Sequence, residues 1–461
     1  MLLVVVLALG LSLGIAASSL AAAHGQSARG TAPRAETPSE VTLTPSPGGV
    51  QVTMAPVGLS LEYPVMAQDL GTGPCPPPAL AAELLRLGSP PLALGGESQD
   101  MTEPGEAATG PPPSWDSATL YGLPSGFWSQ LHCLLSATPD PLTVGLNMKT
   151  AQPSWAAQMV AGSQSAATAG LSFSLGNEPD LYYLPNYSSL GKPAGAEEAG
   201  AVNLYLQLAA SLHQAAGGSA PLVGPELANA AHWQRALPRV IAALHETTVG
   251  VHMYPLTACG SPRAVTVGGL LSATAADAPS RLSWVVADAN AAHVPAIISE
   301  ANSVSCGGEA GVSDSPAAAV WAVRFVLSAL KSGFREVRFH FSGGPYDPFI
   351  VRREEVLDRP LESALVALNQ WLPVGASLQT IAGVQGLVAT RLVTSAGAGR
   401  LILDNERAHS QAVVLRKVHS IRIEALSATR AGAQTTTLSS PRGRIKLVVA
   451  ANTVLAVSSV A

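Results

Sequence analysis

The sequence predicts an α/β fold, a barrel of eight strand–helix units, with an antiparallel β-sandwich at its C-terminal end. Two observations predict it. Between residues 56 and 364, short apolar runs alternate with segments of helical periodicity, whereas residues 365–461 show short runs of alternating apolar and polar residues. Strands that alternate with helices pair in parallel through right-handed crossovers, and eight such units close into a (β/α)8 TIM barrel.

The eight expected strands share one form, a short apolar run that ends in polar residues or glycine. They span residues 57–61, 91–95, 142–148, 171–176, 221–224, 248–253, 295–299 and 336–341. Segments with helical periodicity lie between them, among them residues 79–88, 197–216 and 315–332. The last of these opens with Ser315-Pro316, which predicts an N-cap followed by a first-turn proline.

An additional β-type stretch, residues 41–55, precedes the first expected barrel strand. No helical segment follows it, so it does not fit the strand–helix alternation of the barrel. We therefore expect it to add a strand to the C-terminal sandwich from the other end of the chain.

The first residues indicate export. Residues 1–23 are almost wholly apolar up to small residues that offer a cleavage site near Ala23, which is typical of a signal peptide. Residues 24–40 are rich in Ala, Ser, Pro and Gly and predict a disordered linker. Four cysteines suit an oxidising compartment. We expect a secreted protein without stable membrane insertion after cleavage, with retention of the apolar run as an anchor as the alternative.

Composition and motifs exclude several function classes. The net charge is −5, and no cluster of basic residues exceeds two in a row, which argues against nucleic acid as a partner. No nucleophile-elbow serine, zinc-protease helix, phosphate-binding loop or dinucleotide fingerprint is present. We therefore expect no metal and no cofactor.

Two carboxylates follow expected strands at corresponding places. Glu178 lies in Gly176-Asn-Glu-Pro-Asp180 after the fourth strand, and Glu300 ends the seventh strand. Pro179 favours an extended backbone at Glu178, which should then close the strand. The carboxyl ends of barrel strands carry catalytic groups. Two facing carboxylates are what cleavage of a glycosidic bond requires.

These motifs also resemble a known family. The Asn-Glu-Pro segment with a glutamate after the seventh strand is similar to the retaining barrel glycosidases as a clan. Within that clan the chain resembles glycoside hydrolase family 79, the β-glucuronidase and heparanase-like enzymes. The resemblance covers residues 41–461 and is carried by the stretches 57–63 (VGLSLEY), 94–100 (LGGESQD), 175–180 (LGNEPD), 251–256 (VHMYPL) and 299–308 (SEANSVSCGG).

The resemblance implies roles for four residues. Glu178 would be the general acid/base and Glu300 the nucleophile of a double displacement. Asn177 would bind the 2-hydroxyl of the sugar, and Tyr254 would orient Glu300 and tune its pKa. The substrate would be a β-linked uronic acid residue of an oligosaccharide or glycoconjugate.

Further residues lie near the same rim. Glu62 and Asp100 are candidates for binding sugar hydroxyls. The family holds the uronate carboxylate with tyrosine hydroxyls and backbone N–H groups, for which Tyr346 and two glycines, residues 307 and 308, are candidates. Glu97 departs from the family, which usually has a neutral Asn at this position, and it adds negative charge near the site.

Two of the four cysteines lie near the expected site. Cys259 and Cys306 follow the sixth and seventh strands, so a disulfide between them would brace the loops that carry Tyr254 and Glu300. Cys75 and Cys133 are left either as a pair or as separate buried thiols.

His252 and His340 lie within expected strands, so we expect hydrogen-bonding residues of the barrel interior rather than metal ligands. Two alternatives to the uronidase stay open. One is a glycosidase of the same clan that acts on a neutral sugar or cleaves a polysaccharide internally. The other is a non-catalytic carbohydrate-binding barrel.

Overall fold

The computed structural model describes residues 39–42, 49–105, 121–182, 198–260, 264–382, 384, 386–394 and 399–459. The expected signal peptide, residues 1–23, and the expected linker up to residue 38 lie outside the described residues. Within the described part of the chain, no helix combines the length and apolarity needed to cross a membrane.

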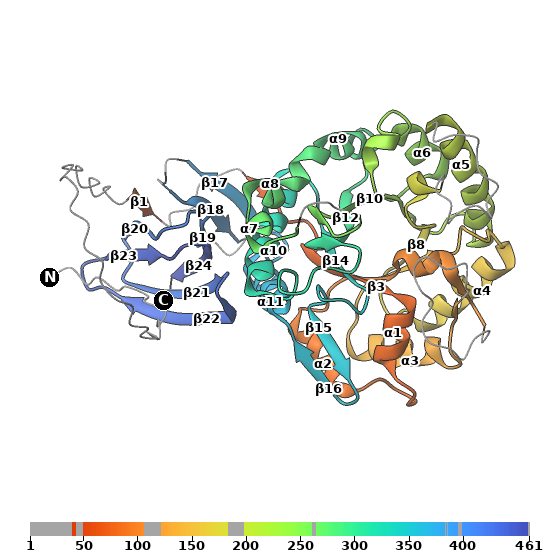
Figure 1. The fold of residues 1–461 in the computed structure, drawn as a ribbon, viewed down its shortest axis with the longest axis horizontal. Coiled ribbons are helices and arrows are strands. Elements are labelled where there is room, and N and C mark those ends of the chain that lie inside the picture. Colours follow the sequence, from red (N-terminus) through yellow and green to blue (C-terminus); the bar gives the residue numbers. More distant parts are fainter. Residues whose placement is uncertain are drawn as a thin grey trace, which may run out of the picture.

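Eight parallel strands form the barrel, each within a few residues of its expected position (Figure 1). They are β3 (Val57–Glu62), β4 (Leu92–Gly95), β7 (Leu142–Leu146), β8 (Leu171–Leu175), β9 (Val223–Leu227), β10 (Thr248–Met253), β12 (Ala296–Ala301) and β14 (Val337–Phe341). Each strand pairs with its neighbours in sequence, and β14 returns to β3. A parallel bridge between Phe173 and Leu222 joins β8 to β9 and closes the ring. The predicted barrel is therefore confirmed.

Helices surround this sheet (Figure 1). The longer ones are α1 (Tyr63–Leu70), α2 (Pro78–Arg86), α3 (Phe127–Ala137), α4 (Pro153–Ala166), α5 (Glu198–Ala215), α6 (Leu237–Leu244), α9 (Ser283–Ala291), α10 (Pro316–Lys331) and α11 (Pro360–Trp371), with the short α7 (Val267–Leu270) and α8 (Ala273–Ala276) before α9. Several begin with proline, whose fixed φ suits the first turn and whose missing N–H would have no partner there. Ser315 stands at the expected cap position of α10, but its hydroxyl donates to the Val312 carbonyl instead of accepting from the helix.

The sandwich consists of two sheets. A seven-stranded sheet has the order β2-β17-β18-β19-β24-β21-β22, and a three-stranded sheet has the order β1-β20-β23. Their strands are β1 (Ser39–Thr42), β2 (Val50–Gln51), β17 (Ser377–Ile381), β18 (Val388–Val393), β19 (Gly399–Asn405), β20 (Gln411–Arg416), β21 (Ser420–Ser427), β22 (Arg430–Ser439), β23 (Arg444–Val449) and β24 (Thr453–Ser459). The N-terminal segment thus adds a strand to each sheet, and β1 begins two residues inside the stretch expected to be linker.

The sandwich packs against the barrel through apolar side chains and one buried ion pair. Leu378, Leu392 and Ile402 of the sandwich belong to the same hydrophobic core as the barrel residues. Arg324 of α10 reaches Asp404 of β19 with bonds of 2.9 and 3.0 Å, and both side chains are buried. The last barrel helix, α11, runs across the boundary expected at residues 364 and 365 and contacts β22 of the sandwich.

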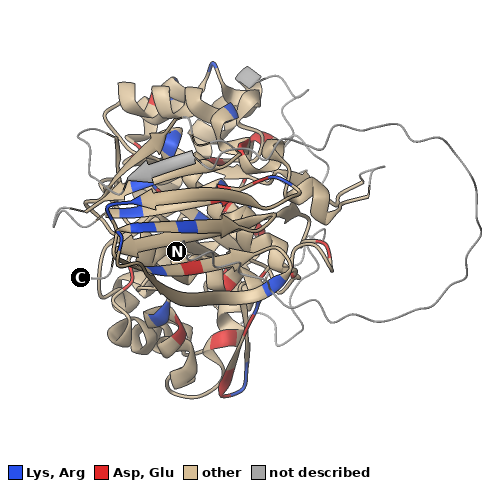
Figure 2. Cartoon of the chain, turned by 90° about the vertical axis from the view of Figure 1, so that its left-hand side faces the viewer, with Lys and Arg blue, Asp and Glu red and all other residues tan. Residues whose placement is uncertain are grey.

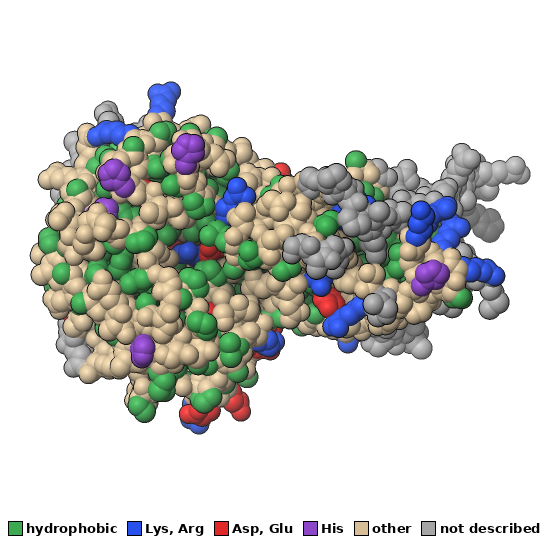
Figure 3. Space-filling view, turned by 180° about the vertical axis from the view of Figure 1, so that it is seen from behind, with side chains coloured by type: hydrophobic (Ala, Val, Ile, Leu, Met, Phe, Trp, Pro, Cys, Tyr) green, Lys and Arg blue, Asp and Glu red, His purple; other side chains and the backbone are tan. Residues whose placement is uncertain are grey.

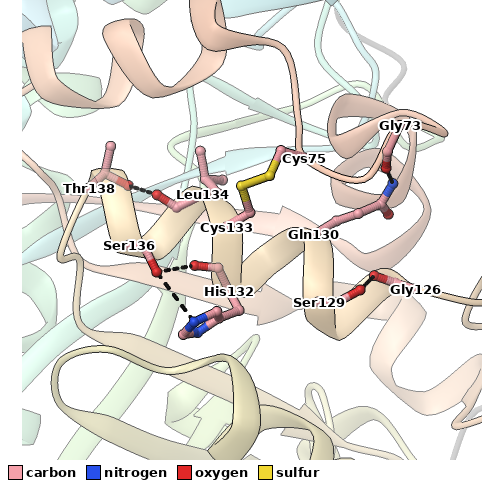
Figure 4. Close-up of a disulfide and its surroundings, with 10 residues drawn as sticks. All are labelled: Gly73, Cys75, Gly126, Ser129, Gln130, His132, Cys133, Leu134, Ser136 and Thr138. Carbon is pink, nitrogen blue, oxygen red and sulfur yellow. Dashed lines mark hydrogen bonds between the residues drawn. A yellow bond between two sulfur atoms is a disulfide. The ribbon is translucent and has the colours of Figure 1, made fainter.

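A disulfide fastens the first barrel loops to α3 (Figure 4). Cys133 of α3 is bonded to Cys75, which precedes α2. One turn earlier on the helix, the Gln130 amide donates to the carbonyls of Gly71 and Gly73, at 3.0 and 2.5 Å. The structure therefore answers the question that the sequence left open, because Cys75 and Cys133 form a pair.

Charge is divided unevenly between the two parts of the molecule. Ten of the 26 Lys and Arg residues, but only three of the 31 Asp and Glu residues, fall between residues 377 and 459. Basic residues occupy neighbouring strands of the sandwich face in Figure 2. From behind, basic side chains again stand out at the sandwich end, while apolar side chains are dispersed over the barrel (Figure 3). The negative charge of the chain is therefore concentrated outside the sandwich.

Candidate active site

A cavity of about 580 Å³ lies at the carboxyl ends of the barrel strands. Its walls bring together residues from loops far apart in the sequence. They are Glu62, Glu97, Asn177, Glu178, Leu181, Ala228, His252, Tyr254, Cys259, Glu300, Ser305, Cys306, Gly307, His340, Ser342 and Tyr346. The barrel fold explains this convergence, because the ends of all eight parallel strands meet at one face.

Glu178 reaches this cavity by a backbone conformation that the sequence analysis did not anticipate. Its φ and ψ are 50° and 53°, in the left-handed region, and β8 ends three residues earlier at Leu175. The expected extended backbone at Glu178 is therefore wrong. Pro179 disfavours a right-handed helical residue before it, and Glu178 adopts the left-handed conformation rather than the extended one. The Glu178 N–H donates to the Glu226 carbonyl at 3.0 Å, which fixes the turn.

Glu300 lies on β12 with its side chain 9% exposed. The Tyr254 hydroxyl donates a 2.8 Å hydrogen bond to Glu300 Oε1. The nitrogen atoms of His252 and His340 lie 3.6 and 3.4 Å from its two oxygens. Burial opposes ionisation, but the two imidazoles and the Tyr254 hydroxyl outweigh it, so the pKa of Glu300 is lowered from its ordinary value.

The two expected catalytic carboxylates face each other. An oxygen of Glu178 and an oxygen of Glu300 lie within 4.8 Å of one another. Carboxyl groups about 5–5.5 Å apart are characteristic of retaining glycosidases, whereas inverting ones need about 6.5–9.5 Å to admit a water molecule. The Glu178 side chain is 24% exposed and thus accessible from the cavity, while Glu300 is held more deeply.

His252 lies between these carboxylates and a third one. Its Nδ1 is 3.0 Å from Glu178 Oε1, and its Nε2 is 3.1 Å from Glu226 Oε2. Burial alone would lower the pKa of His252, but the surrounding carboxylates, first among them Glu300, raise it well above its ordinary value. Glu226 is not among the residues predicted from the sequence, although it stands near the end of β9 as Glu178 and Glu300 stand near the ends of their strands.

A parallel arrangement supports the other side of Glu300. His340 Nε2 lies 3.2 Å from Glu62 Oε1, and the backbone N–H groups of Glu97 and Ser98 donate to the Glu62 carboxylate. The close fit requires glycine at position 96, because a Cβ there would lie 2.6 Å from Glu62 Oε1. Glu62 thus lies in the cavity wall with both oxygens engaged. His252 and His340 are, as expected, hydrogen-bonding residues of the barrel interior.

The remaining candidates near Glu178, Asn177 and Asp100, differ in their access to the cavity. Asn177 lines the cavity. Asp100 does not: it is 1% exposed and accepts from the backbone N–H groups of Met148 and Asn177 and from the Tyr182 hydroxyl. Its place beneath the wall indicates that it holds the Asn177 loop rather than a sugar hydroxyl.

Tyr346 lines the cavity together with Gly307. The Tyr346 ring lies 6.4 Å from that of Tyr254 and 6.0 Å from that of His340, so the three rings form one wall. Gly308 lies against Tyr346, where a Cβ would be 3.1 Å from the ring.

A disulfide joins Cys259 to Cys306 at the edge of the cavity. The short parallel pair β11 (Leu256–Thr257) and β13 (Val304–Ser305) lies beside it. These links connect the loop after Tyr254 with the loop after Glu300, as the sequence analysis expected.

Glu97 is the fourth glutamate of the cavity wall, beside Glu62, Glu178 and Glu300. Burial, followed by repulsion from Glu62, Glu178 and Glu300, raises the pKa of Glu97 to about 8, and Lys149 partly offsets this. Among the described residues that line the cavity, none is Lys or Arg. An anionic sugar would therefore meet neutral donors, imidazoles and carboxylates.

Glu178, His252 and Glu300 are close enough together to be considered as ligands of a metal ion. The histidine does not suit that role. Both of its ring nitrogens already lie within hydrogen-bond distance of a carboxylate, Nδ1 at 3.0 Å from Glu178 and Nε2 at 3.1 Å from Glu226, so the ring offers no free nitrogen to a metal ion.

Comparisons with known proteins show where this fold recurs. No family model matches the sequence, and no curated protein matches it by sequence. Among solved structures, the chain is similar to a 4-O-α-L-rhamnosyl-β-D-glucuronidase from Fusarium oxysporum 12S, with a TM-score of 0.70 and 16% identity over 91% of this chain and 99% of that one.

Two further solved structures are similar over comparable lengths. A family 51 arabinofuranosidase from Xanthomonas axonopodis pv. citri has a TM-score of 0.62 at 11% identity, over 89% of this chain and 97% of that one. A family 30 endoxylanase from Clostridium papyrosolvens C71 has a TM-score of 0.54 at 10% identity, over 92% and 100%. The barrel with its sandwich is thus a fold shared with proteins described as glycoside hydrolases.

Proposed function

We propose that the protein is a secreted retaining glycoside hydrolase, similar to family 79, that cleaves β-linked uronic acid residues from glycans or glycoconjugates. The observation that carries the mechanism is the separation of the two carboxylates, within 4.8 Å at the end of a barrel. The resemblance of the motifs to family 79 and the likeness to the Fusarium glucuronidase support the choice of sugar. Two disulfides are compatible with export.

The reaction follows from the positions of the two carboxylates. Ionised Glu300 attacks the anomeric carbon while Glu178 donates its proton to the glycosidic oxygen, so that the glycosidic C–O bond breaks and a glycosyl ester forms on Glu300. Glu178, now ionised, takes a proton from water, and that water attacks the anomeric carbon. The ester bond to Glu300 then breaks, and both carboxyl groups return to their starting states.

The hydrogen bonds of the site suit these roles. Tyr254 and the two histidines favour the ionised form that Glu300 needs as a nucleophile. Asn177 stands next to Glu178 on the cavity wall, where it would reach the 2-hydroxyl of the sugar. Tyr346 and the N–H groups of Gly307 and Gly308 would hold the uronate carboxylate.

A second candidate function has the same mechanism and differs only in the sugar that is cleaved. Four glutamates line the cavity, and no Lys or Arg is found among the described lining residues. This distribution favours a neutral sugar over an anionic one at any pH where Glu97 is ionised. A non-catalytic carbohydrate-binding role has no comparable support, because it would not need the two carboxylates to face each other.

A panel of nitrophenyl glycosides tests the proposal. We expect turnover of the β-glucuronide above that of the β-glucoside, β-xyloside and α-arabinofuranoside, whereas turnover of a neutral glycoside alone would establish the second candidate. Glu300→Gln should abolish turnover, and Glu309→Gln, on the same loop but outside the cavity lining, should not. Glu178→Ala should regain activity with azide on a substrate with an activated leaving group. If neither Glu300 nor Glu178 variants affect turnover, the assignment is wrong.

A further inference from the structure

A buried carboxylate outside the cavity lining is connected to the proposed acid/base. Glu226 is 6% exposed, and its Oε2 lies 3.1 Å from His252 Nε2. The Ser299 hydroxyl, next to Glu300 on β12, donates to the same oxygen. The Glu226 carbonyl accepts the N–H of Glu178. One residue therefore contacts the backbone of Glu178 and, through His252, its side chain.

The barrel is shaped to allow these contacts. Gly250 of β10 lies between the strands that carry Glu226 and Ser299, and a Cβ there would be 2.8 Å from Ser299 Oγ and 3.1 Å from Glu226 Oε2. Glu226 itself has a φ of 57°, in the left-handed region that a non-glycine residue adopts at some cost in free energy. The backbone is thus held in an unfavourable conformation that directs this carboxylate under His252.

The hydrogen bond to Glu226 decides how His252 faces Glu178. A carboxylate that accepts from Nε2–H keeps a proton on that nitrogen and fixes the plane of the ring. The other nitrogen, Nδ1, is then presented to Glu178 Oε1 at 3.0 Å. Without Glu226 the ring would lose this partner and could turn about its χ2 angle, which has a broad energy profile.

We infer that Glu226 is a positioning residue for acid catalysis: by holding Nε2–H of His252 it fixes the carboxyl group of Glu178 that protonates the leaving group. The inference rests on the proposed function, because it takes Glu178 as the acid. It assigns Glu226 no contact with substrate. Its effect is on one step, the proton transfer that accompanies cleavage of the glycosidic bond.

Leaving-group dependence tests this role, because a substrate with a very good leaving group needs little help from an acid. The wild type, Glu226→Ala and Glu226→Gln are compared on an alkyl glycoside and a dinitrophenyl glycoside of the sugar that the wild type cleaves best. For Glu226→Ala we expect kcat/KM to fall by roughly 100-fold on the alkyl glycoside and by no more than about threefold on the dinitrophenyl glycoside, since general acid catalysis contributes about 10²–10⁴-fold. Glu226→Gln should show a smaller selective loss, because its amide oxygen still accepts from Nε2–H.

Glu246 provides a matched control. It is also a buried glutamate, next to Gly224 of β9, and burial followed by repulsion from Glu226 raises its pKa well above the ordinary value. No hydrogen bond joins it to His252 among the described contacts. Glu246→Gln should therefore leave the ratio of the two kcat/KM values unchanged, whatever it does to the melting temperature.

The outcomes are separable. Equal losses on both substrates in the Glu226 variants, with a selective loss in Glu178→Ala, would overturn the inference alone. An inactive wild type, or equal losses in Glu178→Ala, would refute the proposed function. If Glu226→Ala does not fold, as judged by circular dichroism, the nearly isosteric Glu226→Gln and the variant Ser299→Ala decide the question, and both should show the selective loss.

Discussion

The hydroxyl of Tyr254 donates a 2.8 Å hydrogen bond to Oε1 of Glu300. The two residues lie near the ends of different strands and are 46 positions apart in the sequence. Tyr254 follows β10 and Glu300 lies in the neighbouring β12, so the parallel pairing of these strands brings the two side chains together. The bond stabilises the ionised carboxylate. It therefore links a feature of the fold directly to the nucleophile of the proposed reaction.

Replacing Tyr254 with phenylalanine should raise the pKa of Glu300, because the charged form loses a donor. The acidic limb of the pH profile of kcat/KM should then move to higher pH. Hydrogen bonds to charged groups contribute about 1.5–3 kcal/mol, so we expect a loss of roughly 10- to 150-fold at the pH optimum. Tyr63→Phe is the control, since the Tyr63 hydroxyl is also buried but donates to the Gly145 carbonyl. An unmoved acidic limb in Tyr254→Phe would contradict the prediction.

Glu97 should determine how the enzyme treats an anionic sugar at alkaline pH. Because the pKa of Glu97 is raised to about 8, the group is neutral at about pH 6 and charged at about pH 9. Glu97→Gln should therefore match the wild type at the lower pH and exceed its kcat/KM on a glucuronide by roughly tenfold at the higher one. On a neutral glycoside, the ratio of the kcat/KM of Glu97→Gln to that of the wild type should be the same at both pH values. Glu103→Gln, nearby but outside the cavity lining, is the control, and an equal gain at both pH values would refute this role.

The barrel and the two facing carboxylates could be predicted because they depend on repeated, local patterns. Eight apolar runs specify eight strands, and parallel strands place their carboxyl ends at one face. Glu178 stands shortly after such a run and Glu300 at the end of one, so their convergence required no knowledge of side-chain packing. The strand at the N-terminal end was predictable for the same reason, since a β pattern without a following helix has no place in the barrel.

Contacts that depend on packing could not be predicted. Asp100 and Glu62 lie near corresponding strand ends, yet one is buried under a loop and the other lies in the cavity wall. No local sequence pattern distinguishes the buried position of Asp100 from the cavity-wall position of Glu62. The left-handed backbone of Glu178 also depends on a partner distant in sequence, the Glu226 carbonyl. The signal that could have revealed Glu226 is its position just after the fifth expected strand, residues 221–224.

The Cys259–Cys306 disulfide should affect activity, whereas the Cys75–Cys133 disulfide should affect stability alone. It connects the loops after Tyr254 and Glu300 at the cavity edge, and β11 and β13 add only a short backbone pairing. Replacing both cysteines with serine should lower kcat/KM, and it should also lower the melting temperature, because this disulfide closes a loop of similar length to that of Cys75–Cys133, 47 against 58 residues. The same double replacement of Cys75 and Cys133, which fasten α3 far from the cavity lining, should lower the melting temperature and leave kcat/KM unchanged. The reverse pattern would contradict the prediction.

The Arg324–Asp404 ion pair should stabilise the junction of barrel and sandwich, because its side chains are only 2% and 7% exposed. Asp404→Ala would leave the Arg324 guanidinium buried without its carboxylate partner, and such a loss costs about 3–5 kcal/mol. The exposed pair of Arg422 and Glu424 is the control. Arg422→Ala removes an ion pair whose arginine is 58% exposed, and exposed pairs contribute no more than about 1 kcal/mol. Urea unfolding followed by tryptophan fluorescence measures both, and equal effects of the two substitutions would show that the buried pair does not hold the domains together.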